Sequence, residues 1–471
     1  MAPTDVTPAG QAATETPIRP AIAAPVLAWQ ATRPALSGSL GRDRDLFGQF
    51  WRQGATLLDA LPAKARRDTA EAATAAAIFA TARSARIQFM AAHHRQVYDS
   101  LTGNMSRFVH LDELLSDAAT LVPGLMPDRT VLEREKELAQ RDKDGHEIDQ
   151  GLFLNHVLAD PDCGMHLCHT MLLPRPASLK LLPKFMREGH VTLDGASAER
   201  RGKSTVAVMS NRRFLNAEDD STLAAAEIAV DLCLLDPESQ ICILRGDRIE
   251  HPKYASQRIF GSGINLTRLY QGQIPLLWYL KRDMGFVNKI YRGLARPDIS
   301  PDEVTGETTE KPWVAQLDGF AIGGSCQILL ACDYIVAADN AYMTLPARKE
   351  GIIPGLANMR LWRFTGDRIA RQAIQSERRI DCDSPEGRQI CDEIVPVMAT
   401  EDATEALVDR FLNSGGFSAA ANRRAIRIAQ EPLDLFRRYI AYYAKAEAEC
   451  HFSPQLIANL ERFWGAQNRK I

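Results

Sequence analysis

Two glycines stand between a hydrophobic run and a helix-like run in the stretch AIGGSCQILLACDYIV, residues 321–336. A turn of this kind can direct free backbone N–H groups at an anion or at a polarised carbonyl oxygen. Three residues after the second glycine comes Gln327, where an acid–base enzyme would be expected to carry a carboxylate. The stretch therefore suggests a site that stabilises negative charge but has an amide in place of an acid.

A second glycine-rich loop, FGSGINL at residues 260–266, also runs into a predicted helix. Two backbone N–H groups that converge on one oxygen form an oxyanion hole, which stabilises an enolate or a tetrahedral intermediate. Glycine-rich turns are common in α/β proteins, so each loop alone says little. Only the pair, together with the flanking sequence, is specific.

Other reactive side chains are interpreted as structural. One group comprises Cys163, His166, Cys168 and His169. Adjacent ligands cannot easily close on one tetrahedral ion, and this group lacks the usual paired spacings. Cys326 lies at the glycine turn, but the sequence places no histidine near it. We therefore predict neither a metal site nor a cysteine nucleophile.

Alternating strands and helices must position the two loops. Strands are predicted in STVAVMSN, QICILRGD, KPWVAQLDGFAI and DYIVAADNAYMTL. Helices are predicted in NAEDDSTLAAAEIAVDLCLLDPE, which begins at residue 216, and over residues 266–296. This alternation predicts an α/β core with parallel strands over residues 196–400.

The segments on either side of this core are predicted to be helical. Residues 31–195 form a mostly helical N-terminal domain, in which residues 128–145 are a helix capped by Asp128 and stopped by Gly145. Residues 1–30, rich in Ala, Pro and Thr, are predicted to be a flexible tail. The aromatic stripes of residues 401–471 could pack on the core or on another subunit, and we assign this segment to oligomerisation.

The bulk composition excludes several classes of partner. The 471 residues are 45% hydrophobic with a net charge of −3, which argues against wholesale binding to nucleic acid or anionic membranes. No apolar run approaches the roughly 20 residues of a membrane span, and the N-terminus lacks the pattern of a secretory signal. Nine scattered cysteines indicate reduced thiols. A cytoplasmic protein is therefore expected.

The segment KPWVAQLDGFAIGGSCQILLACDYIVAADNAYMTLPARKEGIIPG resembles the crotonase (enoyl-CoA hydratase/isomerase) family. The resemblance covers about residues 204–396, with SNRRFLNAEDD, GSGINL, GIIPG and DEIVP in the same order. It implies a spiral of ββα turns, assembled as homotrimers or homohexamers, that binds acyl-CoA thioesters. By position it also implies that the backbone N–H groups of Ile264 and Gly324 hold the thioester oxygen.

The departures from the family pattern concern its acid–base residues. A crotonase hydratase adds water with two glutamates, which fall here at Gln327 and Ala347. Glu350 lies three residues further on and would need a different register to serve. Because both carboxylates are missing, we predict that water addition is lost while the enolate-stabilising apparatus is kept.

One branch of the family fits these departures. The helical N-terminal extension, Gln327 and GHEIDQGLFLNHVLADPDCGMHLCHTMLLP resemble the 3,5-dihydroxyphenylacetyl-CoA 1,2-dioxygenases of glycopeptide antibiotic pathways. The resemblance implies cleavage of the thioester by O2 to 3,5-dihydroxyphenylglyoxylate and CoA, without a metal or flavin cofactor. A carbanion can pass one electron to triplet O2, and a neutral amide beside the α-carbon does not protonate that carbanion.

The same resemblance assigns the binding residues. The substrate site comprises Glu218 and Arg282 at the dihydroxyphenyl ring, with Ser262 and Gly263. A helix cap and a solvated charge are the alternatives for Glu218 and Arg282. The residues expected to contact CoA are Arg212, Arg213, Lys253 and Tyr254. Ile352 and Ile353 are expected either to wall an O2 pocket or to pack in the core.

Two other functions stay open at this point. The first is another crotonase-type reaction, such as hydrolysis, decarboxylation or isomerisation of an acyl-CoA. The second is a non-catalytic crotonase-like binding protein, including one that binds RNA. The net charge of −3 and the lack of a basic stripe argue against RNA.

Overall fold

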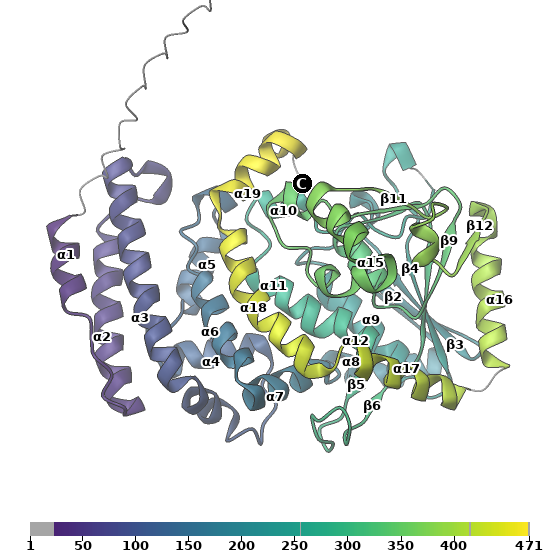
Figure 1. The fold of residues 1–471 in the computed structure, drawn as a ribbon, viewed down its shortest axis with the longest axis horizontal. Coiled ribbons are helices and arrows are strands. Elements are labelled where there is room, and N and C mark those ends of the chain that lie inside the picture. The colour runs from purple at the N-terminus through teal and green to yellow at the C-terminus, as the bar shows by residue number, and fades with distance from the viewer. Residues whose placement is uncertain (1–22, 255, 414–415, 470–471) are drawn as a thin grey trace, which may run out of the picture.

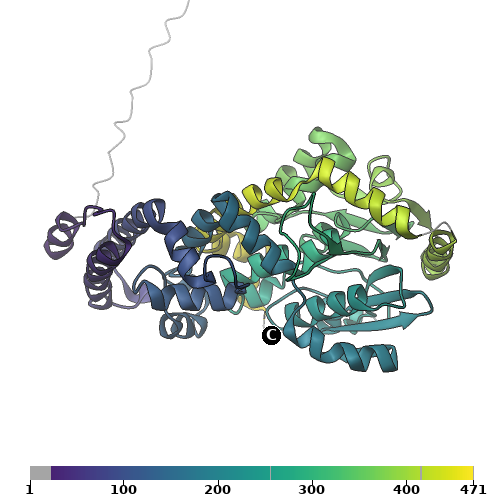
Figure 2. The same cartoon turned by 90° about the horizontal axis from the view of Figure 1, so that it is seen from below.

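A computed structural model describes residues 23–254, 256–413 and 416–469, and it places a helical lobe beside an α/β lobe (Figure 1). Figure 2 shows the same two lobes from below. Most of the predicted tail lies outside the described residues. Its last part is not a tail, because Ala24–Ala31 form helix α1. Trp29 of this helix is buried and stacks on Phe50 at 4.6 Å, which holds α1 on the lobe.

The helical lobe is built around the long helix α3. This helix spans Thr69–Thr102, starts at a capping box between Asp68 and Glu71, and ends at Gly103 in the left-handed conformation. The other helices of the lobe are α2 (Leu40–Asp59), α4 (Leu111–Leu121), α5 (Arg129–Lys136), α6 (Ile148–Ala159), α7 (Pro161–Leu172) and α8 (Pro176–Glu188). The mostly helical N-terminal domain is therefore observed.

Two details of the predicted N-terminal domain are wrong. Asp128 does cap α5, accepting a hydrogen bond from the Val131 N–H at 3.0 Å, but the helix ends at Lys136 rather than at Gly145. The boundary at residue 195 is also misplaced. Strand β1 (His190–Leu193) pairs antiparallel with β2 (Ala196–Arg201), so the core already begins at β1.

The main sheet of the core has the strand order β1-β2-β3-β4-β7-β9-β12. From β3 onward its strands run parallel, as predicted. These strands are β3 (Ser204–Met209), β4 (Ile241–Gly246), β7 (Trp313–Leu317), β9 (Tyr334–Ala338) and β12 (Glu393–Val395). Helix α9 covers only Leu223–Leu235, and the positive φ values of Leu215 and Asn216 exclude the predicted start at residue 216.

A second, smaller sheet produces the spiral. It contains β8 (Phe320–Ile322), β10 (Tyr342–Thr344) and β11 (Ile380–Asp381). Each of the two long predicted strands is in fact a pair: β7 turns into β8, and β9 turns into β10. The chain therefore alternates between the two sheets, which confirms the predicted ββα spiral. A short hairpin, β5 (Leu294–Ala295) with β6 (Thr308–Thr309), projects from the core.

Short helices connect these strands and carry the site. The stretch predicted as helical over 266–296 contains α10 (Leu266–Tyr270), α11 (Leu276–Lys281), a π-helical segment (Arg282–Val287) and α12 (Asn288–Arg292). After the glycine turn come α13 (Gly324–Leu329), α14 (Ala347–Glu350) and α15 (Ala357–Ser376). Segments of π-helix often occur at functional sites.

The C-terminal helices are α16 (Thr400–Leu412), α17 (Gly416–Gln430), α18 (Leu433–His451) and α19 (Pro454–Asn459). Figure 1 shows α18 between the N-terminal helices and the core. The Asn155 amide donates to the Ala441 carbonyl at 2.7 Å, and Gln140 donates to the His451 carbonyl at 2.8 Å. Helix α18 thus joins the two lobes of one chain, and the assigned role in oligomerisation stays a prediction.

Glu431, just before α18, ties three elements together. Its buried carboxylate accepts hydrogen bonds from Arg360 Nε at 2.9 Å, Arg363 at 2.9 Å and Arg292 at 3.2 Å. Burial by itself would raise the pKa of Glu431, but the three guanidinium groups, Arg360 foremost, lower this pKa to about 2.

Among the helices that the structure describes, none is both long and apolar enough to cross a bilayer.

Candidate active site

The two glycine loops lie side by side. The Gly261 N–H donates to the Phe320 carbonyl at 3.2 Å, and the Ile322 N–H donates to the Gly261 carbonyl at 3.1 Å. Gly263 is held in the left-handed conformation, with φ +77°, and a Cβ there would stand 2.6 Å from Ile322 O and 3.1 Å from Gly324 N. Glycine at this position is therefore required for the loops to approach each other.

This approach brings two backbone N–H groups to one pocket. Gly324 is the first residue of α13, and the first N–H groups of a helix have no partner inside it. The bonds on either side of Ile264 run from Glu218 N to Gly263 O and from Asn265 N to Glu218 O. Within the described chain, neither the Ile264 N–H nor the Gly324 N–H has an acceptor. The pair meets the requirement of an oxyanion hole.

A small pocket of about 30 Å³ lies in front of these amides. Of the predicted residues, it is lined by Ile264, Gly324, Gln327, Arg282, Ile352 and Ile353. A volume of this size holds one or two small molecules of the size of water. The two isoleucines form an apolar wall, so both parts of the expectation for them remain compatible with the structure. Their role toward O2 stays a prediction.

A much larger groove, of about 930 Å³, leads to this pocket, because both are lined by Ile264 and Glu350. Arg213, Tyr254 and Ser262 also line the groove, as a binding site for a long thioester would need. Arg212 does not line it. Its guanidinium instead forms an ion pair with Glu250 at 3.2 Å.

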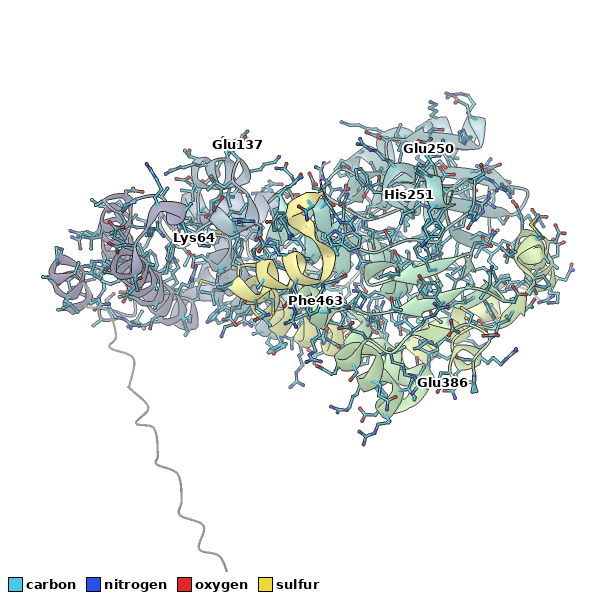
Figure 3. All side chains as sticks on the ribbon, turned by 90° about the horizontal axis from the view of Figure 1, so that it is seen from above. Lys64, Glu137, Glu250, His251, Glu386 and Phe463 are labelled. Carbon is cyan, nitrogen blue, oxygen red and sulfur yellow. The ribbon has the colours of Figure 1, made fainter. Side chains whose placement is uncertain are left out.

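Lys253, an expected CoA contact, does not line the groove, and its ammonium lies 5.0 Å from the centre of the Tyr254 ring. Other residues, which the sequence motifs do not indicate, complete the groove. The missed residues are Phe463, Trp464 and Arg469, from the end of the chain. Figure 3 shows Phe463 on the C-terminal segment, between the two lobes. The aromatic stripe of this segment therefore faces the groove of its own chain.

Arg282, at the start of the π-helical segment, is only 3% exposed. Its Nε and Nη2 donate to the two oxygens of Glu218 at 2.6 and 3.0 Å, and Nη2 also donates to the Gly324 carbonyl at 2.7 Å. Its Nη1 donates to Asp283 at 2.7 Å and to Gln327 Oε1 at 2.9 Å. A guanidinium has five N–H groups, and all five are used within the protein.

These contacts exclude the two structural alternatives for Glu218 and Arg282, whose contacts with the substrate stay predictions. Arg282 is not a solvated charge, and Glu218 does not cap a helix, since α9 starts at Leu223. Burial would lower the pKa of Arg282, but Glu218 and then Asp283 raise it above its usual value, so the guanidinium stays charged. Glu218 itself lines a neighbouring small cavity rather than the pocket or the groove, and Arg282 connects it to the Gly324 carbonyl.

Gln327 is held by the same network. Its Oε1 accepts from Arg282, which leaves the Nε2 H₂ group as the part of the amide that can donate to a ligand. Gly355, the last residue of the GIIPG motif, is required beside it, because a Cβ at this position would overlap Gln327 Oε1. Gln327 therefore offers a fixed, uncharged donor within the pocket.

Glu350, three residues beyond the hydratase position, also lines the pocket. Helix α14 is a single turn from Ala347 to Glu350, and residues three apart in a helix lie on the same face. Both residues line the pocket. This spacing is visible in the sequence and could have identified Glu350. Asp283 and Tyr279 also line the pocket, but the sequence carries no signal for either.

The cysteine and histidine group lies in α7, in the helical lobe. The Tyr98 hydroxyl and His166 Nδ1 form a hydrogen bond of 2.7 Å, and His169 Nε2 donates to the Arg296 carbonyl at 3.0 Å. Across the ranges that the structure describes, no three His, Cys, Asp or Glu side chains are grouped as a metal site would require. Cys326 is buried behind the glycine turn, and burial raises the pKa of its thiol to about 12.

Comparison with known proteins places this fold and site in a class. A family model described as enoyl-CoA hydratase/isomerase matches residues 301–439. A relative that is 41% identical over 431 residues extends the match to 91% of this chain. The chain therefore belongs to the enoyl-CoA hydratase/isomerase (crotonase) family. That relative is the (3,5-dihydroxyphenyl)acetyl-CoA 1,2-dioxygenase of Amycolatopsis orientalis, of which 98% is covered.

Two further comparisons cover a smaller part of the chain. The carnitinyl-CoA dehydratase of Citrobacter koseri is 27% identical over 211 residues, which are 44% of this chain and 70% of that protein. Among solved structures, an enoyl-CoA hydratase/isomerase from Xanthobacter autotrophicus Py2 is 18% identical, with a TM-score of 0.48. The match covers 59% of this chain and 96% of that structure.

Proposed function

We propose that this protein is a dioxygenase that cleaves 3,5-dihydroxyphenylacetyl-CoA with O2 to 3,5-dihydroxyphenylglyoxylate and CoA, without a metal or organic cofactor. The observation that carries the proposal is the 41% identity to the Amycolatopsis dioxygenase over 98% of its length, including the helical lobe. The site supports it, because the paired amides are kept while Gln327 and Ala347 stand where a hydratase has its two acids.

The chemistry follows from the groups in the pocket. The N–H groups of Ile264 and Gly324 bind the thioester oxygen and stabilise the enolate that forms when an α-proton leaves. The enolate passes one electron to O2, and the two radicals combine to a peroxide at the α-carbon. The peroxide attacks the thioester carbonyl and expels CoA as its thiolate, which leaves a cyclic peroxide. Loss of the second α-proton then breaks the O–O bond and gives the α-keto acid. Both oxygen atoms of O2 end in the glyoxylate, and the two α-hydrogens leave as protons, so no external reductant is needed.

The ion pair of Glu218 and Arg282 supports binding of the dihydroxyphenyl ring. Arg282 has no N–H left to give, whereas each Glu218 oxygen accepts one bond from Arg282 and has a further lone pair. We therefore assign the contact with a ring hydroxyl to Glu218. Arg282 then acts as a positioning residue that holds Glu218, Gln327 and the Gly324 carbonyl in one arrangement.

The groove supports binding of the CoA part of the substrate. Arg213 and Tyr254 from the core, with Arg469 from the end of the chain, offer cations for phosphates and an aromatic face for adenine. Arg212 and Lys253 are withdrawn from this role by their contacts with Glu250 and the Tyr254 ring. We therefore limit the proposed CoA contacts from the core to Arg213 and Tyr254.

The test is oxygen uptake with 3,5-dihydroxyphenylacetyl-CoA after exhaustive chelation. One molecule of O2 is expected to disappear for each CoA released, with 3,5-dihydroxyphenylglyoxylate as the product. As a control, 3,5-dihydroxybenzoyl-CoA has the same ring and thioester but no α-hydrogens, so it should bind without consuming O2. Release of CoA at the full rate under strict anaerobiosis would overturn the proposal in favour of a hydrolase.

A non-catalytic role is tested by thermal unfolding of the protein with the same two compounds. If neither aryl-CoA raises the temperature of thermal unfolding, the groove does not bind these thioesters, and the proposal fails.

The environment of the enzyme belongs to the proposal as well. All nine cysteines are free thiols, which suits a reducing cytoplasm, and the resemblance places the reaction in glycopeptide antibiotic biosynthesis.

We also propose a homotrimer or homohexamer, as is usual in this family. Two exposed aromatic side chains support an interface: Trp362 on α15 is 51% exposed and Tyr442 on α18 is 69% exposed. Large exposed aromatic residues are enriched at interfaces between subunits. Sedimentation equilibrium measures the assembly directly, and a monomer at micromolar concentration would contradict it.

A further inference from the structure

Glu350 has a position that none of the other acidic side chains of the pocket shares. It lines both the small pocket with the paired amides and the large groove, so it stands at the junction between them. A thioester that extends from the groove to the amides of Ile264 and Gly324 must pass this junction. The α-carbon is bonded to the thioester carbonyl carbon, so it also lies in this part of the site.

The geometry of α14 explains how a carboxylate reaches the pocket without the family's glutamate. Ala347 is at the hydratase position, and its methyl group cannot exchange a proton. One helical turn later the side chain of Glu350 returns to the same face, and Gly351 with φ +92° ends the helix at once. Glu350 thus brings a carboxylate to the same pocket that Ala347 lines.

Glu218 and Asp283 are already bound to a cation. Both oxygens of Glu218 accept from Arg282, and Asp283 Oδ1 accepts from Arg282 at 2.7 Å. A third buried acid, Glu447, accepts a hydrogen bond from the Ile353 N–H at 2.9 Å but does not line the pocket. The carboxylate of Glu350, in contrast, has no hydrogen bond or ion pair within the described chain. A carboxylate that is free of cations keeps its basicity and can take a proton from a ligand.

We propose that Glu350 is the catalytic base that removes the α-proton of the bound thioester. The inference rests on the proposed function for the identity of the substrate. In this step a Glu350 oxygen takes the hydrogen as a proton, and the C–H electron pair moves into the enolate. The enolate oxygen is held by the Ile264 and Gly324 amides. Gln327, which cannot donate a proton as an acid does, remains beside the carbanion while O2 reacts.

The surroundings of Glu350 suit this task. Burial, and next the negative charge of Glu377 after α15, raise the pKa of Glu350 to about 7. The other titratable groups that face it across the pocket are Tyr279 of α11, Arg282 and Asp283 of the π-helical segment, and Tyr443 of α18. On its own helix, Lys349 pairs with Glu377 at 3.3 Å. A base with a pKa near the working pH is the most effective one.

The test separates proton removal from oxygen chemistry. 3,5-Dihydroxyphenylacetyl-CoA is incubated with the enzyme in deuterated buffer without oxygen, and loss of the α-proton signal is followed by NMR. Glu350→Gln has nearly the same shape and is expected to slow this exchange by a factor of about 10² to 10⁴. Thermal unfolding and binding of 3,5-dihydroxybenzoyl-CoA show whether the variant is folded and still binds.

Glu377→Gln is the matched variant, because Glu377 influences Glu350 but does not line the pocket. The wild-type exchange rate should rise about tenfold per pH unit below pH 7 and then level off, since the base must be ionised. Removing the charge of Glu377 favours ionised Glu350, so this midpoint should move to lower pH while the plateau rate is kept. This shift keeps the proposal testable even if Glu350→Gln does not fold.

Two results would overturn the assignment. One is a folded, ligand-binding Glu350→Gln enzyme that exchanges the α-proton within threefold of the wild-type rate. The other is a Glu377→Gln enzyme whose midpoint does not move. Failure of the proposed function has a different signature: a wild-type enzyme that exchanges the α-proton but consumes no O2. That result would support Glu350 as the base and contradict the proposed dioxygenase reaction.

Discussion

Replacing Gly263 with alanine tests the oxyanion hole directly. Gly263 has φ +77°, and an added Cβ would stand 2.6 Å from the Ile322 carbonyl oxygen and 3.1 Å from the Gly324 amide nitrogen. Both neighbours are backbone atoms, which cannot turn aside as a flexible side chain can. The loop that carries the Ile264 N–H must therefore move away from the loop that carries the Gly324 N–H.

The expected magnitude has two parts. A left-handed conformation costs a non-glycine residue roughly 1–2 kcal/mol of stability. Alanine at position 202 would have this conformational cost and no other, because φ there is +57° and an added Cβ would meet nothing within 4 Å. Gly202→Ala is therefore the matched control. Only Gly263→Ala should also misplace an oxyanion donor, and loss of one such donor lowers kcat by about 10²–10³.

The assay is anaerobic exchange of the α-proton in deuterated buffer, together with oxygen uptake and thermal unfolding for each variant. Gly202→Ala should lose only the stability that the left-handed conformation costs, and Gly263→Ala should lose more because of its backbone overlap. Only Gly263→Ala should lose both exchange and oxygen uptake, because both steps need the enolate. The reasoning is refuted if folded Gly263→Ala exchanges the α-proton as fast as Gly202→Ala. In that case the two amides would not hold the thioester oxygen.

Three further changes have defined outcomes. Gln327→Glu should lower oxygen uptake relative to α-proton exchange, because an acid beside the carbanion returns the proton; an unchanged ratio of the two rates counts against the role of the amide. Arg282→Met should lower the free energy of unfolding by about 3–5 kcal/mol, since it leaves buried acceptors such as Asp283 unpaired, and denaturant titration measures this loss. Finally, the pKa of Glu431 is lowered from 4.5 to about 2. Its contribution of about 3 kcal/mol is therefore complete above pH 4.5 and lost as the pH falls through 2, and Glu431→Gln should flatten the dependence of the unfolding temperature on pH in this range.

Local patterns in the sequence predict much of the fold. The Ala-rich run of α3 and the parallel strands β3 and β4 follow from hydrophobic periodicity over contiguous residues, and the structure confirms them. The boundaries were less accurate. The hairpin of β1 and β2 crosses the predicted domain boundary, and α9 starts seven residues late, at Leu223 instead of residue 216. Gly189, with positive φ, stands directly before β1, and Leu215 and Asn216, also with positive φ, exclude a helix at residue 216.

In the candidate site, too, the sequence predicts what lies within one motif but not the contacts between distant segments. Gly324 and Gln327 are close in sequence, so one motif predicts their neighbourhood. Arg282 could be selected, but its five contacts depend on groups from the loop before α9, from α13 and from its own π-helical segment, which only folding brings together. Residue type alone therefore could not show that this arginine has no donor left for a ligand.

By itself the sequence determined the family, the two glycine loops and the absence of both hydratase glutamates, because each is a property of a short contiguous segment. Only the tertiary structure decided that Glu350 stands at the junction of pocket and groove, and that Arg213 rather than Arg212 lines that groove. It also decided that Phe463 and Trp464 cover the groove. These features bring together segments such as those of Arg213 and Phe463, about 250 residues apart, and their geometry depends on how the two sheets, α14 and the C-terminal segment pack together.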